Sequence, residues 1–340
     1  MSKIITQKYT SVSEIDLEFI SPLEELLEGK IPSFEFITNA EKLASPDTKF
    51  NYFLFFGNQT NAPIGFAQIK LVKDAPQKKG FLQRLLKKNS PAREINENAA
   101  FWNISGTKGD GIVFNPKYSQ HIGEKTTQVF KDIIEREDVY FQKINFSERY
   151  QKNLITSDAI KSSSQNEHIV IDSLLKNKSS YEEYLSSLAD GTKNQIIQSW
   201  KYSQRELAFK MGEYENLKEA FHYKKRGGEQ LKQLKQNEKF KLYNLKNAQM
   251  AFLTFETEVE IKALSFFIKG TGGHYFYDSI ILDESLPELI PHQQVIMHFF
   301  EQTEGNRLHY LGEELQQDYL LKLGFTYTKQ YSYTVKKNDH

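Results

Sequence analysis

The stretch DYLLKLGFTYTKQYSYTV, residues 318–335, decides how the second half of the chain is interpreted, because it joins a short helix to an aromatic strand. Gly324 follows the run YLLKL, and glycine is preferred just past a helix end because it accepts a positive φ. Aromatic and polar residues then alternate, as is typical of a half-buried strand. We predict that a helix ends at Gly324 and that the strand completes the sheet of the second half. Its tyrosines are expected to serve packing rather than catalysis.

Upstream of this ending, short apolar runs alternate with helical patterns. They predict the order strand, strand, strand, helix, strand, helix, strand for residues 248–256, 259–270, 274–282, 289–305, 307–312, 313–324 and 325–335. The first half predicts a hairpin, two strands, a helix and a strand at residues 51–72, 99–105, 111–115, 119–137 and 139–147. We therefore predict an α/β chain of the α+β type in which one architecture is used twice.

Composition narrows the class of protein. The chain has 340 residues, of which 39% are hydrophobic, so it can bury a core and form two domains. Lys plus Arg and Asp plus Glu both number 44, and this zero net charge argues against a DNA-binding protein. No cysteine is present, which excludes disulfides, thiolate catalysis and Cys-ligated zinc.

The apolar segments are short. The first residues, MSKIITQKYTSVSEIDLEF, contain no long apolar run, so we expect neither a signal peptide nor an anchor. No stretch reaches about 18 uninterrupted apolar residues, so no membrane span is expected. Together with the lack of cysteine, these features lead us to expect a cytoplasmic protein.

The middle of the chain carries the most specific resemblance. Residues 168–207 read HIVIDSLLKNKSSYEEYLSSLADGTKNQIIQSWKYSQREL, a strand, a short helix and a longer basic helix. This junction, the element order and the YLLKLGF ending resemble the acyl-CoA N-acyltransferase (GNAT) fold over residues 50–335. The doubled unit is similar to the Fem-like branch of peptidoglycan-bridge aminoacyltransferases. The resemblance implies two tandem GNAT-like domains, residues 1–165 and 166–340, each a mixed sheet flanked by helices, with a helical junction at 179–246.

The resemblance also implies a reaction. An amine acceptor, either a small molecule or a peptidoglycan-precursor-like compound, would attack an activated acyl or aminoacyl donor directly, with no covalent enzyme intermediate. The donor would be an acyl-CoA used as a co-substrate or an aminoacyl-tRNA, and no tightly bound cofactor is expected. The alternative is a catalytically degenerate binding or scaffold protein that has the fold without the reaction.

The phosphate-binding loop departs from the family pattern. GNAT enzymes carry Q/R-x-x-G-x-G/A before the helix that follows the fourth strand, where backbone N–H groups bind pyrophosphate. Here the equivalent loop, ILDESLPELIPHQQ (281–294), has no glycine and has three acidic residues that would repel an anion. The nearest match, QKKGFL (77–82), makes Gln77, Lys79 and Gly80 the candidate cofactor-binding residues. A solvated connector is the alternative interpretation of that segment.

Two further positions differ. The family's Thr-Arg at the junction is Thr192-Lys193 here, so the charge is kept and the bidentate recognition of arginine is lost. Lys193 and Lys201 are the candidate substrate-binding cations of this helix. Leu320 stands where many GNAT enzymes have a general-acid tyrosine, and Tyr319 lies about 100° further round the helix.

The run RLHYLGEE (307–314) supplies the candidate catalytic base. His309 sits near the end of a predicted strand, where ligands bind in α/β sheets, and its pKa suits proton removal from an amine. Asp278, on a neighbouring strand, is the candidate to orient it. Tyr277, Tyr310 and Glu313 are candidate substrate-binding residues of the same edge. The alternative is a structural histidine at a strand end.

Other histidines and lysines point to no further site. His292 and His298 lie six residues apart on one predicted helix and face different sides, so no metal site is predicted. The lysine-rich run from residue 221 to residue 246 would suit tRNA or another anion, although interspersed acids favour a solvated helix face.

Overall fold

The computed structural model describes residues 4–58, 61–75, 97–107, 110–137, 139–154, 164–287, 289–312 and 317–336. Contacts divide the chain into two compact units. The first unit comprises Met1–Leu26, Ala44–Ile169 and Lys329–His340, and the second comprises Leu27–Leu43 and Val170–Thr328. Relative to the expected domains 1–165 and 166–340, residues 27–43 therefore belong with the second unit and residues 329–340 with the first.

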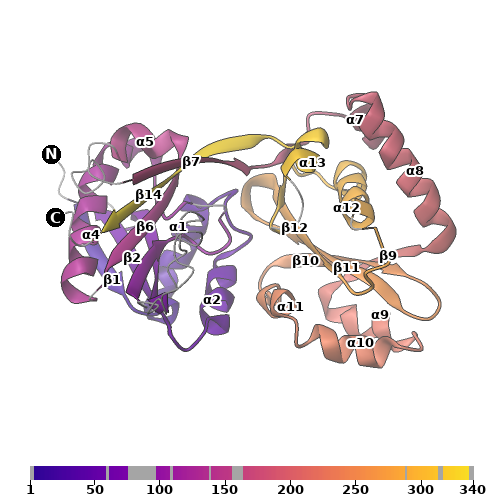
Figure 1. Cartoon of the computed structure of the whole chain (residues 1–340), viewed down its shortest axis with the longest axis horizontal. Helices are drawn as coiled ribbons and strands as arrows, with labels where there is room; N and C mark the ends of the chain where they lie inside the picture. The colour runs from indigo at the N-terminus through magenta and orange to yellow at the C-terminus, as the bar shows by residue number, and fades with distance from the viewer. Residues whose placement is uncertain are drawn as a thin grey trace, which may run out of the picture. The chain divides into compact units, whose positions relative to one another are not determined.

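The first unit is built on an eight-stranded mixed sheet (Figure 1). Its order is β1 (Ile4–Tyr9), β2 (Thr48–Gly57), β3 (Pro63–Ala75), β4 (Glu97–Trp102), β6 (Phe141–Ser147), β14 (Tyr327–Lys336) and β7 (Ser164–Ile171), with β5 (Ile112–Phe114) also paired to β3. The strands β4 and β6 run parallel, whereas β14 is antiparallel to β6. The predicted hairpin of β2 and β3 is confirmed.

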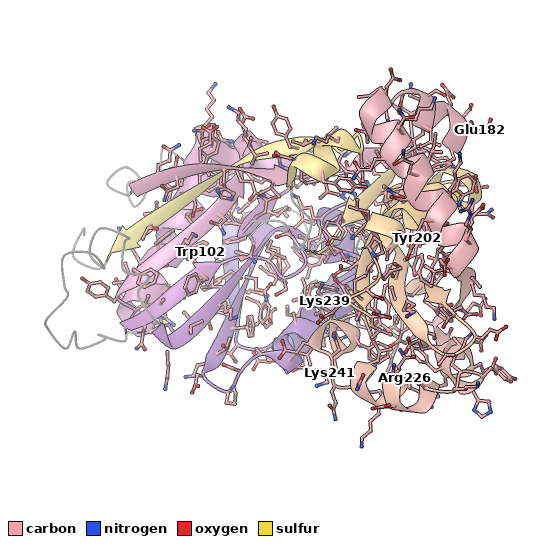
Figure 2. All side chains as sticks on the ribbon, turned by 45° about the vertical axis from the view of Figure 1, so that its right-hand side comes forward. Trp102, Glu182, Tyr202, Arg226, Lys239 and Lys241 are labelled. Atoms are coloured by element: carbon pink, nitrogen blue, oxygen red, sulfur yellow. The ribbon has the colours of Figure 1, made fainter. Side chains whose placement is uncertain are left out.

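Helices cover this sheet. They are η1 (Val12–Glu14), α1 (Leu17–Leu26), η2 (Pro116–His121), α4 (Ile122–Arg136) and α5 (Glu148–Leu154). Residues at alternate strand positions pack against α4, where Trp102, labelled in Figure 2, stacks on Phe130 with ring centroids 4.6 Å apart. On the same side, Phe146 stacks on Tyr333 at 5.1 Å. Tyr331 and Tyr333 are therefore core residues, as predicted, whereas Tyr327 at the start of β14 is exposed.

The second unit has a six-stranded mixed sheet. Its order is β8 (Leu174–Leu175), β13 (Arg307–Tyr310), β12 (His274–Ile281), β11 (Ile261–Lys269), β10 (Gln249–Glu256) and β9 (Ala208–Glu213). The pair β12 and β13 is parallel, and the other neighbours are antiparallel. The predicted order of three strands, a helix, a strand and a helix is confirmed in this unit.

Helices pack on both faces of the second sheet. One face carries α7 (Tyr181–Ser186), α8 (Asp190–Glu206), α12 (Leu289–Gln302) and α13 (Gln317–Lys322). The other carries α2 (Phe34–Leu43), η3 (Tyr214–Asn216), α9 (Leu217–His222), α10 (Gly227–Leu234) and α11 (Glu238–Leu242), while η4 (Thr271–Gly273) leads into β12. Alternation along β12 directs Tyr275 and Tyr277 to the first face and Phe276 to the second, as predicted. Two mixed sheets flanked by helices confirm the predicted fold class.

The final strand corrects one expectation. The helix α13 does end at Gly324, whose φ is +84°, and the Phe325 N–H donates to the Leu320 carbonyl at 3.1 Å. However, the following strand joins the first sheet beside β6 and not the sheet of the second half. The physical reason is that Leu174–Leu175 already pairs with β13 and occupies that edge. The first sheet thus contains a strand from beyond the expected domain boundary.

Candidate active site

The parallel strands β12 and β13 separate at one edge of the second sheet. Their pairing runs from His274 opposite Arg307 to Tyr277 opposite Tyr310, and the Leu311 N–H then donates to the Tyr277 carbonyl at 2.8 Å. Beyond this bond β12 continues beside β11 alone. The carboxyl ends of parallel strands are where α/β sheets bind ligands, so the candidate site lies at this point.

Gly312 marks the place where the chain leaves β13. A Cβ atom at Gly312 would overlap the Tyr310 hydroxyl and lie 2.6 Å from Asp278 Oδ1. The phenol and the carboxylate therefore both reach the backbone of Gly312. Only glycine fits there, since any side chain would displace one of these two groups.

The carboxylate of Asp278 is almost completely buried, with 1% of its surface exposed. It accepts a hydrogen bond from the Tyr243 hydroxyl at 2.6 Å and lies 3.5 Å from Lys239 Nζ. Lys239 and Lys241, labelled in Figure 2, belong to α11, which brings the cation to the site. A buried carboxylate needs such partners, because an unpaired charge in a low dielectric is strongly destabilising.

Tyr277 makes the last backbone hydrogen bond between β12 and β13. Two residues further along β12, Ser279 has the next backbone N–H group that points toward β13. It donates to Asp278 Oδ1 at 2.7 Å instead of to a β13 carbonyl. The carboxylate thus holds the backbone donor that becomes available where the two strands part.

Two buried aromatic groups and a histidine from α12 complete the site. The rings of Tyr277 and Tyr310 lie 5.1 Å apart, and His292 contacts both edge-on. Its Nδ1 lies 3.4 Å from the Tyr277 hydroxyl. Burial, reinforced by the nearby Lys239, lowers the pKa of His292 to about 3, so its imidazole is neutral at neutral pH. Burial also raises the pKa of Tyr277 well above its ordinary value, so its phenol stays protonated.

The first turns of α12 and α13 are also in contact. Gln293 Nε2 donates to the Tyr319 hydroxyl at 3.2 Å, and burial raises the pKa of that phenol. Leu320 is buried in the core beside them. Thus the tyrosine on α13 contacts α12, while the neighbouring leucine packs inside, as expected for positions about 100° apart.

His309 lies in β13, buried, on the same face as Asp278 because its backbone pairs with Phe276. Its Nε2 is 2.8 Å from His274 Nδ1, and its Nδ1 is 3.0 Å from the Asp172 carbonyl oxygen. The ring stacks on Phe276 at 4.8 Å. The contacts described for His309 are thus with His274, Asp172 and Phe276. Those described for Asp278 are with Tyr243, Lys239 and Ser279.

The remaining predicted residues are distributed more widely. Tyr277 and Tyr310 lie in the site described above. Lys193 is half-buried and Lys201 exposed, both on α8. Gln77, Lys79, Gly80 and Glu313 lie outside the described residues, so their predicted roles stay predictions. The sequence did not single out Tyr243 and Lys239, which are 35 and 39 residues before Asp278 and approach it only through the fold.

The loop before α12 keeps its acidic character. Asp283 forms an ion pair with Lys262, and its pKa is lowered to about 2 by hydrogen bonds from Lys262 and Ser285. It is therefore ionised at neutral pH. Its charge is balanced by Lys262, so the predicted repulsion of an anion at this loop stays a prediction.

A separate cavity of about 670 Å³ lies toward the amino end of β12. It is lined in part by Met250, Phe267, Tyr275 and His298. Burial lowers the pKa of His298. Its lining shares no residue with the group around Gly312.

No group of three or more His, Asp or Glu side chains in the described ranges is arranged to hold a metal ion. Within the same ranges, no helix has the length and apolar character required to cross a membrane.

Comparison with known proteins identifies similar folds only. No family model matches the chain, and no curated protein matches its sequence. A conserved protein of unknown function from Bacteroides thetaiotaomicron is 9% identical, with 95% of this chain and 98% of that chain covered and a TM-score of 0.51. A tandem GNAT protein from the clavulanic acid biosynthesis pathway is 10% identical, covering 98% and 99%, with a TM-score of 0.46.

A third similar structure is the C-terminal domain of a putative lysylphosphatidylglycerol synthetase from Agrobacterium fabrum. It is 9% identical, covering 93% of this chain and 91% of that chain, with a TM-score of 0.49. At such identities the likeness concerns the fold and leaves the chemistry to be argued from the residues.

Proposed function

We propose that the chain is an N-acyltransferase of the tandem GNAT, Fem-like type, which transfers an acyl or aminoacyl group from an activated donor to an amine. The observation that carries the proposal is the parting of the parallel strands β12 and β13 at Tyr277 and Tyr310. The backbone there offers an N–H donor, and the Asp278 carboxylate and the Tyr310 hydroxyl meet beside Gly312. A carbonyl held at such a point can be polarised by backbone N–H groups while an amine attacks it.

In the proposed reaction the amine nitrogen forms a bond to the donor's carbonyl carbon. The bond from that carbon to the thioester sulfur or ester oxygen then breaks. The proton lost by the amine passes to Asp278, which the buried Tyr243 and Lys239 hold in place. The Tyr310 hydroxyl gives a proton to the leaving sulfur or oxygen, and the proton that Asp278 took from the amine then returns to Tyr310, since both groups meet beside Gly312. For the Ser279 N–H to polarise the acyl carbonyl, the carbonyl oxygen must replace Asp278 Oδ1 as the acceptor of its hydrogen bond.

His309 is the second candidate for removing the proton, as the sequence predicted. Both of its ring nitrogens are engaged, one with His274 and one with the Asp172 carbonyl. It would act only after the bond to His274 opens. We favour Asp278 because each of its carboxylate oxygens can accept a further hydrogen bond beside the one it already has.

The donor is proposed on electrostatic grounds. The acidic loop before α12 disfavours the pyrophosphate of an acyl-CoA in the second unit. The helical region 217–246 contains nine Lys and Arg residues and three Glu residues, which favours a polyanionic donor such as an aminoacyl-tRNA. We therefore rank aminoacyl-tRNA above acyl-CoA as the donor, with a small or peptidoglycan-precursor-like amine as acceptor.

A catalytically degenerate binding protein is the second candidate function. The Asp278 carboxylate favours this candidate, because it already accepts the hydrogen bond of the Ser279 N–H at the point where the strands part. The same acidic loop supports it, because this loop stands where the family's phosphate-binding loop is expected and has no glycine. In this case the fold would bind a partner without transferring a group.

The test is a transfer assay read by mass spectrometry. The protein is incubated with acetyl-CoA or with a mixture of charged tRNAs, and with amino acids and amino-sugar peptides as acceptors. An N-acylated or N-aminoacylated acceptor is the expected product. A thermal-shift titration with each donor runs in parallel, since a bound donor raises Tm with concentration. No product and no shift with either donor would leave the degenerate alternative standing.

A further inference from the structure

The cavity of about 670 Å³ toward the amino end of β12 is formed by residues of the second unit alone. Its volume falls within the range of small-molecule sites, about 300–1,000 Å³. Every residue that lines it lies within the described ranges 164–287 and 289–312. We propose that this cavity binds an organic cation, a primary ammonium group carried on an aromatic or aliphatic body.

Strand register forms the floor of the cavity. Phe267 lies opposite Ala251, and Ala251 lies opposite Glu213, so one row of side chains crosses β11, β10 and β9. Alternation turns this row to the face of the sheet that carries α12. Ala251 has the smallest side chain of the row and leaves space between the phenyl ring and the carboxylate. A ligand in this space would contact an apolar wall on one side and a negative charge on the other.

Aromatic rings make the apolar wall. Phe267 stacks on Tyr275 with ring centroids 5.0 Å apart, and His298, from α12, meets Phe267 edge to face at 5.1 Å. Burial lowers the pKa of His298, so this imidazole carries no charge at neutral pH. The wall therefore adds no positive charge to the cavity, and aromatic rings themselves attract cations.

The rim of the cavity is acidic. Glu213 and Glu215 both line it, both are exposed, and within the described ranges neither forms an ion pair. Lys269, exposed at the end of β11, is the one lining residue with a positive charge at neutral pH. Two carboxylates and one ammonium give the lining a net charge of −1. A cation is therefore favoured over an anion.

Hydrogen bonding favours a primary ammonium. Such a group donates three hydrogen bonds and accepts none, and the two rim carboxylates only accept. Gln249 and Gln302 also line the cavity, and their side-chain amides can accept as well. A quaternary ammonium has no N–H group and could use none of these acceptors. The site shares no residue with the group around Gly312, so it is additional to the proposed acyl transfer.

The test is isothermal titration calorimetry of the full-length chain at neutral pH, with probes of one shape and different charge. They are phenethylammonium, phenethyl alcohol and phenylpropanoate, with hexylammonium as the aliphatic probe. We expect both ammonium compounds to bind in a saturable manner. Phenethylammonium should bind about tenfold more tightly than phenethyl alcohol, as for two partly exposed charge contacts, and phenylpropanoate should not bind. Shifts of the Ala251 and Lys269 backbone amides in nuclear magnetic resonance spectra should place the probe in the cavity.

Two variants separate the charge from the shape of the cavity. Glu213→Gln/Glu215→Gln should weaken the binding of phenethylammonium by about tenfold and leave that of phenethyl alcohol unchanged. Ala251→Leu should prevent the binding of both, because the larger side chain fills the space beside Phe267. Glu219→Gln is the matched control, since Glu219 is an exposed carboxylate on α9, which packs on the other face of the same sheet. It should leave every titration unchanged.

Thermal unfolding checks that each variant is folded, and the exposed glutamate positions decide the matter if Ala251→Leu does not fold. The proposal would be wrong if neither ammonium compound bound, or if phenylpropanoate bound as tightly as phenethylammonium. It would also be wrong if the double glutamate variant kept the parent affinity. None of these substitutions touches Asp278 or Tyr310, so a failure here is distinct from a failure of acyl transfer.

Discussion

Asp278 connects three elements of the candidate active site: β12, α11 and the turn at Gly312. Its carboxylate is bound by the Tyr243 hydroxyl and the Ser279 N–H, with Lys239 nearby, and its Oδ1 approaches Gly312. The sequence singled out Asp278 from its place on a strand beside His309. It could not reveal the partners from α11, because those contacts depend on how the helices pack. Single substitutions at Asp278, His309 and Tyr243 therefore test which residue removes the proton from the amine.

Asp278→Asn keeps the shape of the side chain and removes its capacity to take the amine proton. We expect turnover to fall by about 10²–10⁴-fold, the range for loss of a general base. His309→Gln should change turnover by less than about tenfold and should lower Tm, since the ring bridges His274 and Asp172. Steady-state kinetics and thermal unfolding of both variants measure this. The reverse pattern, with His309→Gln inactive and stable, would return the base to His309.

Tyr243→Phe serves as the control for the Asp278 variant. It removes the 2.6 Å bond to the carboxylate and leaves the charge in place. We expect a turnover loss of about tenfold, as for one hydrogen bond of about 1.4 kcal/mol. A loss as large as that of Asp278→Asn would show that the carboxylate is needed only as part of the buried network.

His292 makes the stability of the second unit depend on pH. Its pKa is about 3 in the folded chain against 6.5 for an ordinary histidine, so the unfolded state takes up the proton first as the pH falls. The free energy of unfolding should therefore decrease below about pH 6.5, by about 1.4 kcal/mol for each pH unit. Burial lowers the pKa of His274 and His298 as well, which adds to the same trend.

Urea unfolding between pH 6.5 and 5 measures this slope, because most carboxylates remain ionised there. His292→Gln has no group that titrates in this range, and its slope should be smaller by about 1.4 kcal/mol per pH unit. Equal slopes for the parent and the variant would mean that His292 is protonated in the folded state.

At the scale of elements, the sequence predicted best where a pattern was both long and regular. The hairpin of β2 and β3, the helix α12 and the end of α13 follow directly from apolar runs and glycine. Two edge strands were missed. The strand β1, IITQKY, is only six residues long and contains three consecutive polar residues. The strand β9, AFKMGE, follows α8 with no glycine or proline between them. The prediction that β14 joins the sheet of the second half was also wrong. Alternation of apolar and polar residues predicts a half-buried strand, but it does not identify the strand beside it.

Gly324 allows a direct test at this scale, because it ends α13 with a φ of +84°. Gly324→Ala has room for the added methyl group, whose nearest neighbour would be 3.6 Å away, so the penalty comes from the backbone. We expect the free energy of unfolding to decrease by about 1–2 kcal/mol. Gly191→Ala, within α8 where an added Cβ meets nothing, should instead increase it by about 0.5–1 kcal/mol. Equal effects in urea unfolding would contradict the assigned helix end.

At the scale of the whole molecule, the two units exchange segments of chain. The strand β14 follows every other element of the second unit and pairs with β6 in the first sheet. In the other direction, residues 27–43 come from the N-terminal region and belong to the second unit. There, Glu35 accepts bonds from the Lys246 and Asn247 N–H groups, both at 2.9 Å, and Phe36 packs near Tyr243. A chain cut at the expected domain boundary would therefore leave both parts incomplete.

Fragments 1–165 and 166–340 test this dependence. The first fragment lacks β14, so β6 would have an unpaired edge and the core would lose Tyr331 and Tyr333. The second lacks α2, so it would lose the bonds made by Glu35 and expose the surface around Tyr243. We expect neither fragment to unfold cooperatively alone, because each has lost part of a core that a marginally stable domain requires. Mixing the fragments should restore a cooperative transition and protect the β14 amides from hydrogen exchange, since the antiparallel pairing with β6 needs no covalent link between them. An isolated fragment that unfolds at the Tm of the intact chain would show that the exchanged segments add little, and each half of the sequence would then be a complete folding unit.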